Sequence, residues 1–353
     1  MENIDYEALV QSADPDNRII AAEHGYGWDI LVHDPVPDVR LAIALQGYRL
    51  DILANDSDAL VAETAKYMSY VESDNYEQRV EAAEHGFGLE TLIHDSEPEV
   101  RAAVAEKGHE LEVLINDPDV SVRAAVARQK FKLDVFVKDE SWHVRAAVAR
   151  QGYKLDVLVK DRDWRVRTEV ARQNFGLDIL VKDEDWSVRA AVANQGYGLD
   201  ILVNDDDDDI RAAVARQGFG LDILVKDKDW RVREAVANQG YGLDILFNDE
   251  DECVRAAVAR QGYGLDVLVN DKDWSVRTEV ACQGYGLDIL VNDDVVDVRS
   301  AVARQGYKLD TLVHDESASV RATVANMGYG LEILVHDKSM WVREIAEKKL
   351  CEG

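Results

Sequence analysis

The chain has 353 residues, of which 47% are hydrophobic and 31% charged, so its apolar content suits a large folded core and excludes wholesale disorder. It carries 40 Lys and Arg against 69 Asp and Glu, a formal net charge of −29. Because phosphate backbones and anionic membranes attract Lys and Arg, this charge disfavours direct nucleic-acid binding and membrane binding, and it favours a basic protein partner.

The chain opens with a segment, residues 1–11, that we expect to form an N-terminal cap. Its sequence has neither the basic start nor the apolar core of a signal peptide, and no later run is apolar enough for a membrane span. Cys253, Cys282 and Cys351 are too few and too irregularly spaced for a disulfide framework or a thiolate metal site. We therefore expect a soluble, cytoplasmic protein.

Residues 12–116 contain irregular and strongly acidic repeats. They begin at Ser12 and Asp34, but the unit that starts at Asp56 has only 17 residues before the next unit starts at Ser73. Residues 1–116 hold 25 acidic and 7 basic residues, a net charge of −18, whereas the rest of the chain has a net charge of −11. The short unit lacks the second half of a repeat, which predicts a kink in the stack of repeats.

Residues 117–336 repeat regularly every 22 residues, and residues 337–353 read as a C-terminal capping half-repeat. We number the positions of each unit from its first aspartate. These aspartates, including that of the unit just before residue 117 and that of the C-terminal half-repeat, are Asp95, Asp117, Asp139, Asp161, Asp183, Asp205, Asp227, Asp249, Asp271, Asp293, Asp315 and Asp337.

Each unit predicts one three-turn helix followed by one short helical turn. In the unit 227–248, Asp229 at position 3 suits a helix N-cap, and apolar residues at positions 6, 9 and 10 form one helical stripe. Gly240 at position 14 suits the left-handed residue that ends a helix, although Lys130 and Asn174 replace it in two units. Apolar residues at positions 17, 20 and 21 then predict an α or 3₁₀ turn.

No unit of this kind can bury its apolar stripe alone, so the units must stack. The sequence therefore predicts an all-α solenoid of about sixteen repeats.

The run VRxAVAxxG, followed by a short Leu-rich turn, resembles the leucine-rich repeat variant family, which is related to HEAT-like repeats. The resemblance covers residues 12–350 and implies a right-handed solenoid with the long helices on the convex side and the short helices on the concave side. It also implies a ladder of ion pairs between repeats, because an Asp precedes an Arg by six residues, as in Asp139 and Arg145. The family's iron–sulfur module is not expected, since no cysteine precedes Cys253. The resemblance implies no activity.

Three columns of side chains recur in the repeats. The arginines at position 7, from Arg18 to Arg343 with Ala62 as the exception, are interpreted as a structural ladder with the position 1 aspartates. The aspartates at position 18 suit N-caps of the short turn, and they also form an acidic stripe that can face a basic partner; they are Asp156, Asp178, Asp200, Asp222, Asp244, Asp266, Asp288 and Asp310. The tryptophans at position 4 either pack between units or serve as aromatic binding anchors; they are Trp142, Trp164, Trp186, Trp230 and Trp274.

The acidic third of the chain is a second candidate region. We expect a concave face within residues 12–116 to contact a basic partner through Asp51, Glu72, Asp74, Glu77 and Glu90.

Metal sites and catalysis are disfavoured. Two Glu-His pairs, Glu23-His24 and Glu84-His85, raise the alternative of an iron site, but they suit helix ends better. The run 205–209 of five aspartates lacks the spacing of a calcium loop and reads as a solvated loop. No nucleophile–base arrangement, phosphate-binding glycine loop or zinc spacing is apparent. We expect no metal and no cofactor.

The sequence therefore favours a non-catalytic scaffold or adaptor that binds a basic protein. One alternative is an acidic nucleic-acid mimic that inhibits a nucleic-acid-binding enzyme of the restriction or CRISPR type. A second alternative is a lyase or hydroxylase of the HEAT-like kind.

Overall fold

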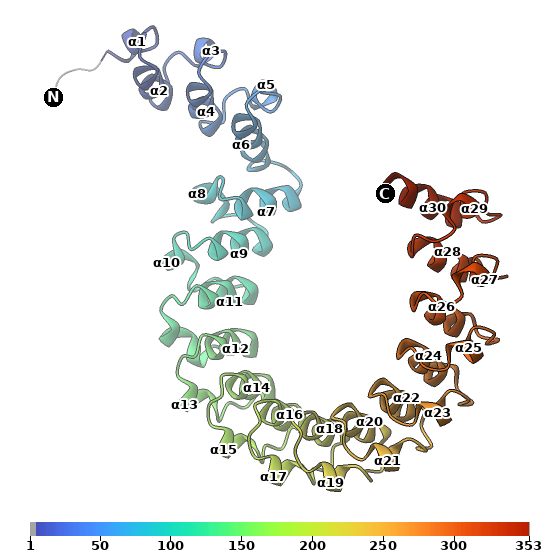
Figure 1. The fold of residues 1–353 in the computed structure, drawn as a ribbon. Coiled ribbons are helices and arrows are strands. Elements are labelled where there is room, and N and C mark those ends of the chain that lie inside the picture. The colour runs from blue at the N-terminus through green and yellow to red at the C-terminus, as the bar shows by residue number, and fades with distance from the viewer. Residues whose placement is uncertain (1–4, 353) are drawn as a thin grey trace. The chain divides into compact units, whose positions relative to one another are not determined.

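The computed structural model describes residues 5–352, and the regular structure within them is entirely helical. The chain forms two compact units, unit 1 (Met1–Gln173) and unit 2 (Asn174–Gly353). Residues 1–4 of the expected N-terminal cap and residue 353 of the expected C-terminal cap lie outside the described residues. The prediction of an all-α solenoid is confirmed, because within each unit every long helix packs against the next long helix along the chain (Figure 1).

Long and short helices alternate in both units, as the repeat predicts, except at the short repeat of residues 56–72. The long helices of unit 1 are α2 (Pro15–Glu23), α4 (Pro37–Leu45), α6 (Ala59–Tyr70), α7 (Tyr76–Glu84), α9 (Pro98–Glu106), α11 (Val120–Arg128), α12 (Trp142–Arg150) and α14 (Trp164–Arg172). Its short helices are α1 (Tyr6–Leu9), α3 (Trp28–Leu31), α5 (Leu50–Leu53), α8 (Leu89–Leu92), α10 (Leu111–Leu114), the 3₁₀ helix η1 (Leu133–Lys138) and α13 (Leu155–Leu158).

Unit 2 has the same alternation. Its short helices are α15 (Leu177–Leu180), α17 (Leu199–Leu202), α19 (Leu221–Leu224), α21 (Leu243–Leu246), α23 (Leu265–Leu268), α25 (Leu287–Leu290), α27 (Leu309–Leu312) and α29 (Leu331–Leu334). Its long helices are α16 (Trp186–Asn194), α18 (Asp208–Arg216), α20 (Trp230–Asn238), α22 (Glu252–Arg260), α24 (Trp274–Cys282), α26 (Val296–Arg304), α28 (Ala318–Asn326) and α30 (Met340–Glu352).

The long helices begin and bury the residues that the repeat predicts. Asp229 at position 3 caps α20 by accepting a hydrogen bond from the backbone N–H of Arg231. Val232, Ala235 and Val236 at positions 6, 9 and 10 are buried, as predicted. The alanines at positions 9 and 11 add little volume, so successive long helices can approach closely.

Two left-handed residues separate the long helix from the short one. The glycine at position 14 has a positive φ, 72° at Gly196, and Lys130 and Asn174 adopt the same conformation with φ of 61° and 58°. The residue at position 16 is also left-handed, with φ of 62° at Gly198 and 50° at Lys154, and this second requirement was not predicted. The Gly-Tyr-Gly motif thus ends one helix with its first glycine and starts the next helix with its second.

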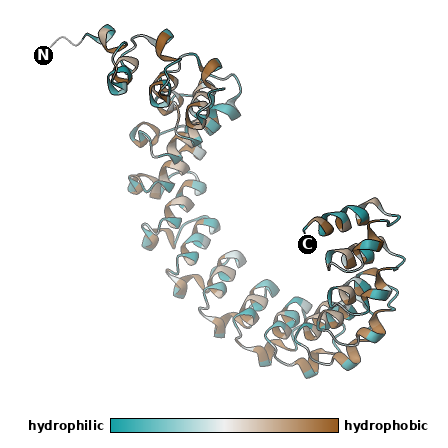
Figure 2. Ribbon diagram, turned by 45° about the horizontal axis from the view of Figure 1, so that its top comes forward, coloured by the Kyte–Doolittle hydropathy of each residue, from teal (hydrophilic) through white to brown (hydrophobic). Residues whose placement is uncertain are grey.

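Within unit 2 the helices follow an arc, with the long helices on the inner side and the short helices on the outer side (Figure 1). The layer arrangement implied by the family resemblance, with convex long helices, is therefore wrong for this unit. The small buried alanines of the long helices permit a close approach, whereas the bulkier buried Leu and Val of the short helices need more space between repeats. Figure 2 shows these short helices as predominantly apolar segments.

The short repeat at residues 56–72 produces the predicted kink. Helix α6 runs directly towards α7 with no short helix between them, and the direction of stacking within unit 1 changes at this point (Figure 1). Across residues 5–352, none of the helices combines the length and the apolar character that crossing a bilayer requires.

Candidate protein-binding surface

An arginine–aspartate ladder holds the repeats in place. The guanidinium of Arg211 donates two hydrogen bonds to the carboxylate of Asp227, at 2.7 and 3.0 Å, and a third to the backbone carbonyl oxygen of Asp205, at 2.8 Å. The same ion pair recurs along the chain from Arg18 to Arg321, and the side chains of the pairs at Arg18, Arg40, Arg79, Arg101, Arg123, Arg145, Arg189, Arg211, Arg233, Arg255, Arg277, Arg299 and Arg321 are at most 15% exposed. The structural interpretation of the position 7 arginines is confirmed.

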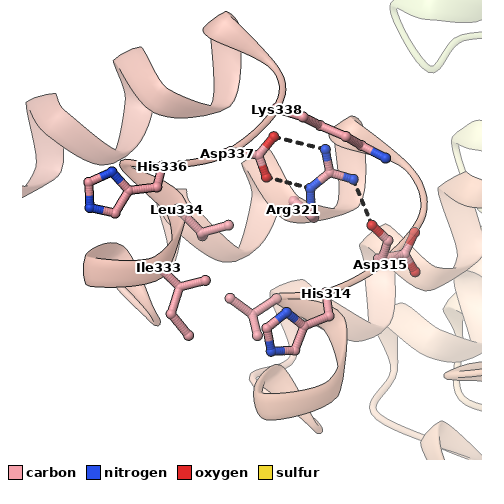
Figure 3. A pocket seen from close by; sticks show the side chains of 9 residues that line it. His314, Asp315, Arg321, Ile333, Leu334, His336, Asp337 and Lys338 are labelled. Atoms are coloured by element: carbon pink, nitrogen blue, oxygen red, sulfur yellow. Dashed lines mark hydrogen bonds and ion pairs between the residues drawn. The ribbon is translucent and has the colours of Figure 1, made fainter.

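The pairing within the ladder differs from the expected one in a single respect. The aspartate six residues before each arginine contributes only its backbone carbonyl, as Asp315 does for Arg321 in Figure 3. The carboxylate that binds Arg321 belongs to Asp337, the first residue of the next repeat. One guanidinium therefore joins the loop of its own unit to the loop of the following unit.

The ladder pair Arg211–Asp227 is held in its charged form. Desolvation raises the pKa of Asp227, but the hydrogen bonds from Arg211 and from the backbone N–H of Asp229, together with the charge of Arg211, outweigh it and bring the pKa below its ordinary value of 3.8. The hydrogen bond to Asp227 raises the pKa of Arg211, so both partners stay charged at neutral pH. The ladder carboxylates are thus satisfied inside the molecule and do not contribute to a binding surface.

The position 18 carboxylates, by contrast, are exposed. All the members of the predicted acidic column, from Asp156 to Asp310, face solvent. They are not N-caps, because the left-handed residue at position 16 caps each short helix without a side-chain hydrogen bond. The carboxylates lie in the first turn, where the helix dipole favours negative charge.

Two tyrosines at position 15, Tyr48 and Tyr153, contact the position 18 carboxylates. The hydroxyl of Tyr48 donates a hydrogen bond to Asp29, which is the position 18 residue of the preceding unit. This hydrogen bond raises the pKa of Tyr48, and the equivalent contact with Asp134 raises the pKa of Tyr153. The tyrosine ring therefore extends the column with a half-buried aromatic surface.

An apolar row beside the acidic column was missed by the sequence analysis. The β-branched residue at position 19 is between 45% and 58% exposed in most repeats; these residues are Ile30, Val113, Val135, Val157, Ile179, Ile201, Ile223, Ile245, Val267, Ile289 and Ile333. The signal was available, because a helical turn that buries positions 17, 20 and 21 must direct position 19 outwards. We call positions 18 and 19 together the short-helix face.

A groove between two repeats of unit 2 places Trp274 at the edge of this face. This groove of 550 Å³ is lined by Trp274 at position 4 and by Ile289 at position 19, with the ladder pair Arg277–Asp293 also in its lining. In unit 2 the tryptophans Trp186, Trp230 and Trp274 are 51%, 37% and 46% exposed. The position 4 and position 19 side chains thus offer aromatic and aliphatic surface beside the carboxylates.

The position 4 tryptophans of unit 1, Trp142 and Trp164, both contact Arg165. The guanidinium of Arg165 lies 4.5 Å from the ring centre of Trp142 and 4.6 Å from that of Trp164. Both rings are half-buried. The packing interpretation suits Trp142 and Trp164, and the anchor interpretation suits the three position 4 tryptophans of unit 2.

The five acidic residues expected on one concave face of residues 12–116 are divided between two locations. Asp51 and Glu90 lie on the short helices α5 and α8, in the position 18 column. Glu77 lies in the first turn of the long helix α7, and Glu72 and Asp74 lie in the segment before it. All five are exposed, but only Asp51 and Glu90 belong to the short-helix face.

The Glu-His pairs occupy helix ends. The Nδ1 atoms of His24 and His85 lie 2.8 Å from the backbone oxygens of Ile20 and Glu81. Within residues 5–352 no three His, Cys, Asp or Glu side chains are grouped as metal ligands.

The aspartate run 205–209 is more structured than a solvated loop. Asp205 pairs with the ladder arginine Arg189, and Asp207 caps α18. Asp208 and Asp209 contact Arg231.

Comparison with known proteins assigns no family. No protein-family model matches the chain, and no curated protein matches it. An engineered protein solved by a structural genomics consortium shares 17% identity over 98% of this chain and 97% of its own, with a TM-score of 0.19. A tubulin-recruiting TOG domain array of microtubule polymerases shares 12% identity over 99% of this chain and 91% of its own, with a TM-score of 0.18. At these TM-scores neither match carries an argument about this chain.

Proposed function

We propose that this chain is a non-catalytic scaffold that binds a basic partner protein on its short-helix face. The observation that carries the proposal is the repetition of one exposed carboxylate next to one exposed β-branched residue, for example Asp200 beside Ile201. Carboxylates steer and orient a basic partner, and apolar side chains supply the area that is buried on contact. We also propose that the chain is related to the leucine-rich repeat variant family and that it has no catalytic role.

The apolar row favours protein binding over nucleic-acid mimicry. A mimic of a phosphate backbone needs a dense array of carboxylates and gains nothing from a row of Ile and Val. Successive long helices pack about 8–10 Å apart, whereas successive phosphates of one strand lie roughly 6–7 Å apart, so a single column does not reproduce the phosphate spacing. The basic partner is therefore expected to present apolar side chains among its Lys and Arg residues.

Affinity capture with two matched variants tests the proposal. The first variant, Asp200→Asn with Asp222→Asn and Asp244→Asn, removes three charges from the column. The second, Glu140→Gln with Asp206→Asn and Glu250→Gln, removes three exposed charges outside it. We expect the captured partner to be lost from the first variant and retained by the second, and capture by the unchanged protein to weaken as salt rises.

A third variant tests the apolar row. Ile201→Ser with Ile223→Ser and Ile245→Ser leaves the net charge unchanged, and we expect it to weaken capture about as strongly as the loss of the three aspartates. Capture that survives both column variants would refute the proposed face. Displacement of the partner by polyanionic DNA, with no effect of the serine variant, would favour the nucleic-acid mimic instead.

A further inference from the structure

The short unit at residues 56–72 is followed by a copy of the start of the chain. Residues 6–34 and residues 67–95 share the same pattern 61 residues apart, including Tyr6 and Tyr67, Ser12 and Ser73, and the two Glu-His-Gly runs. In all the other described units, a complete repeat precedes the long helix. The shared pattern marks both segments as places where the regular repeat starts.

Aromatic stacking at the two starts is the same. The ring of Tyr6 stacks on His24 and Tyr26 with centroid distances of 4.4 and 5.2 Å. The ring of Tyr67 stacks on His85 and Phe87 at 3.9 and 5.6 Å. Val10 and Val71 also take equivalent places, each lying against the glycine that starts the next short helix. Tyr6 and Tyr67 thus cover a first long helix that has no complete repeat before it.

The ladder also begins anew at the second start. Position 1 is serine only at Ser12 and Ser73, the two places where no arginine precedes it. Each serine hydroxyl bonds instead to the amide side chain at position 6 of its own unit, Asn17 at 3.1 Å and Gln78 at 2.5 Å. The other units have Val or Ile at position 6. The serine and the amide therefore form a local substitute for the missing rung.

The segment before the second start is a shortened repeat. It has 17 residues and no short helix, and its helix α6, with 12 residues, is longer than the 9-residue helix α7 that follows. The contact between α6 and α7 is the least extensive of those between successive long helices in unit 1. Its ion pair, Lys66 with Glu81 at 3.2 Å, is exposed, unlike the ladder pairs.

We propose that the chain contains two solenoids in tandem, the first ending and the second beginning in α6, and that the α6–α7 contact is a joint across which they unfold and move independently. This inference goes beyond the proposed function and does not depend on it. A continuous solenoid couples each repeat to both neighbours. The joint lacks the ladder rung and the short helix through which the other repeats of unit 1 are coupled.

Hydrogen exchange of the full chain in increasing urea tests the independence in unfolding. Leu31→Ala in the first solenoid and Leu114→Ala in the second each remove a buried side chain that is at most 2% exposed. We expect Leu31→Ala to speed exchange on the order of 100-fold in residues 15–70 and to leave α7 and α9 unchanged. Leu114→Ala is expected to speed exchange on both sides of its own repeat, in α9, α11 and α12. An effect of Leu31→Ala that continues through residues 71–75 into α9 would overturn the joint.

Spin-label distances in the full chain test the independence in motion, after Cys253, Cys282 and Cys351 are replaced by serine. Labels at residues 45 and 106 span three helix-to-helix steps across the joint, and labels at residues 106 and 172 span three steps without it. We expect a distinctly broader distance distribution for the first pair. Equal widths would show that α6 and α7 are coupled as firmly as any other repeats.

Discussion

At the residue scale, the fold depends on two left-handed residues in each repeat. Glycine adopts this conformation freely, whereas other L-residues pay a steric cost. At position 16 the chain uses Gly in most repeats, but it uses Lys132, Lys154 and Lys308 with φ between 43° and 50°. A repeat with lysine at position 16 is therefore expected to be less stable than a repeat with glycine there.

Lys154→Gly is expected to stabilise the protein by about 0.5–1 kcal/mol, because relief of the left-handed strain exceeds the larger entropy that glycine has in the unfolded chain. Urea unfolding followed by circular dichroism measures the change. Gly198→Ala is the opposing control and should destabilise, since its Cβ would lie 2.4 Å from Cγ2 of Val181. A loss of stability in Lys154→Gly would show that the lysine side chain makes a compensating contact.

At the element scale, the ladder decides how repeats couple. Each rung combines a bidentate ion pair with a backbone hydrogen bond inside a poorly solvated loop, and it joins two long helices that otherwise touch through small apolar side chains. The exposed position 18 aspartates share the charge of the rung aspartates but none of these contacts. Burial and partners, not residue type, separate the two columns.

Asp227→Ala removes one rung between α18 and α20 and should destabilise by about 3 kcal/mol, because Arg211 keeps its charge in a buried site without its carboxylate. Asp222→Ala removes an exposed carboxylate from the adjacent short helix and should change stability by no more than about 0.5 kcal/mol. The free energy of unfolding from urea titrations compares them. Equal losses in the two variants would mean that the rung contributes no more than general surface charge.

At the scale of the whole molecule, many similar rungs titrate together. The pKa values of Asp34, Asp56, Asp95, Asp139, Asp205, Asp227, Asp293, Asp315 and Asp337 are all below the ordinary value. A carboxylate with a lowered pKa in the folded state stabilises that state above the pKa of the unfolded chain. This stabilisation is lost as the pH falls through the lower, folded value.

We therefore expect a melting temperature that changes little from pH 7 to about 4.5 and falls steeply below about pH 4. Neutralisation of the exposed carboxylates relieves repulsion in the same range, but salt already screens those charges near physiological ionic strength. Differential scanning calorimetry between pH 7 and pH 2.5 measures the profile. A melting temperature that rises below pH 4 would show that relief of repulsion outweighs the ladder.

Much of this fold can be predicted from the sequence alone. A 22-residue period with Asp, Val, Ala and Gly at fixed positions permits one local structure, and the repeats must stack to bury their apolar stripes. The long helices, their Asp caps, the glycine stops, the structural role of the arginines and the kink after the short unit were all predicted in this way. These features depend on interactions within a repeat or with the next one along the chain.

Only the tertiary structure decided what depends on how repeats stack. It showed that the carboxylate of each rung comes from the following unit. Arg211, for example, binds the carboxylate of Asp227 and only the backbone oxygen of Asp205. The sequence spacing cannot show which loops meet. It placed the short helices on the outer side of unit 2, because the side-chain volumes in the two layers set the direction of curvature. It also showed that Ile201 is exposed beside Asp200. It also showed Tyr67 stacked as Tyr6 is, which gave the Glu-His pairs their place at two solenoid starts.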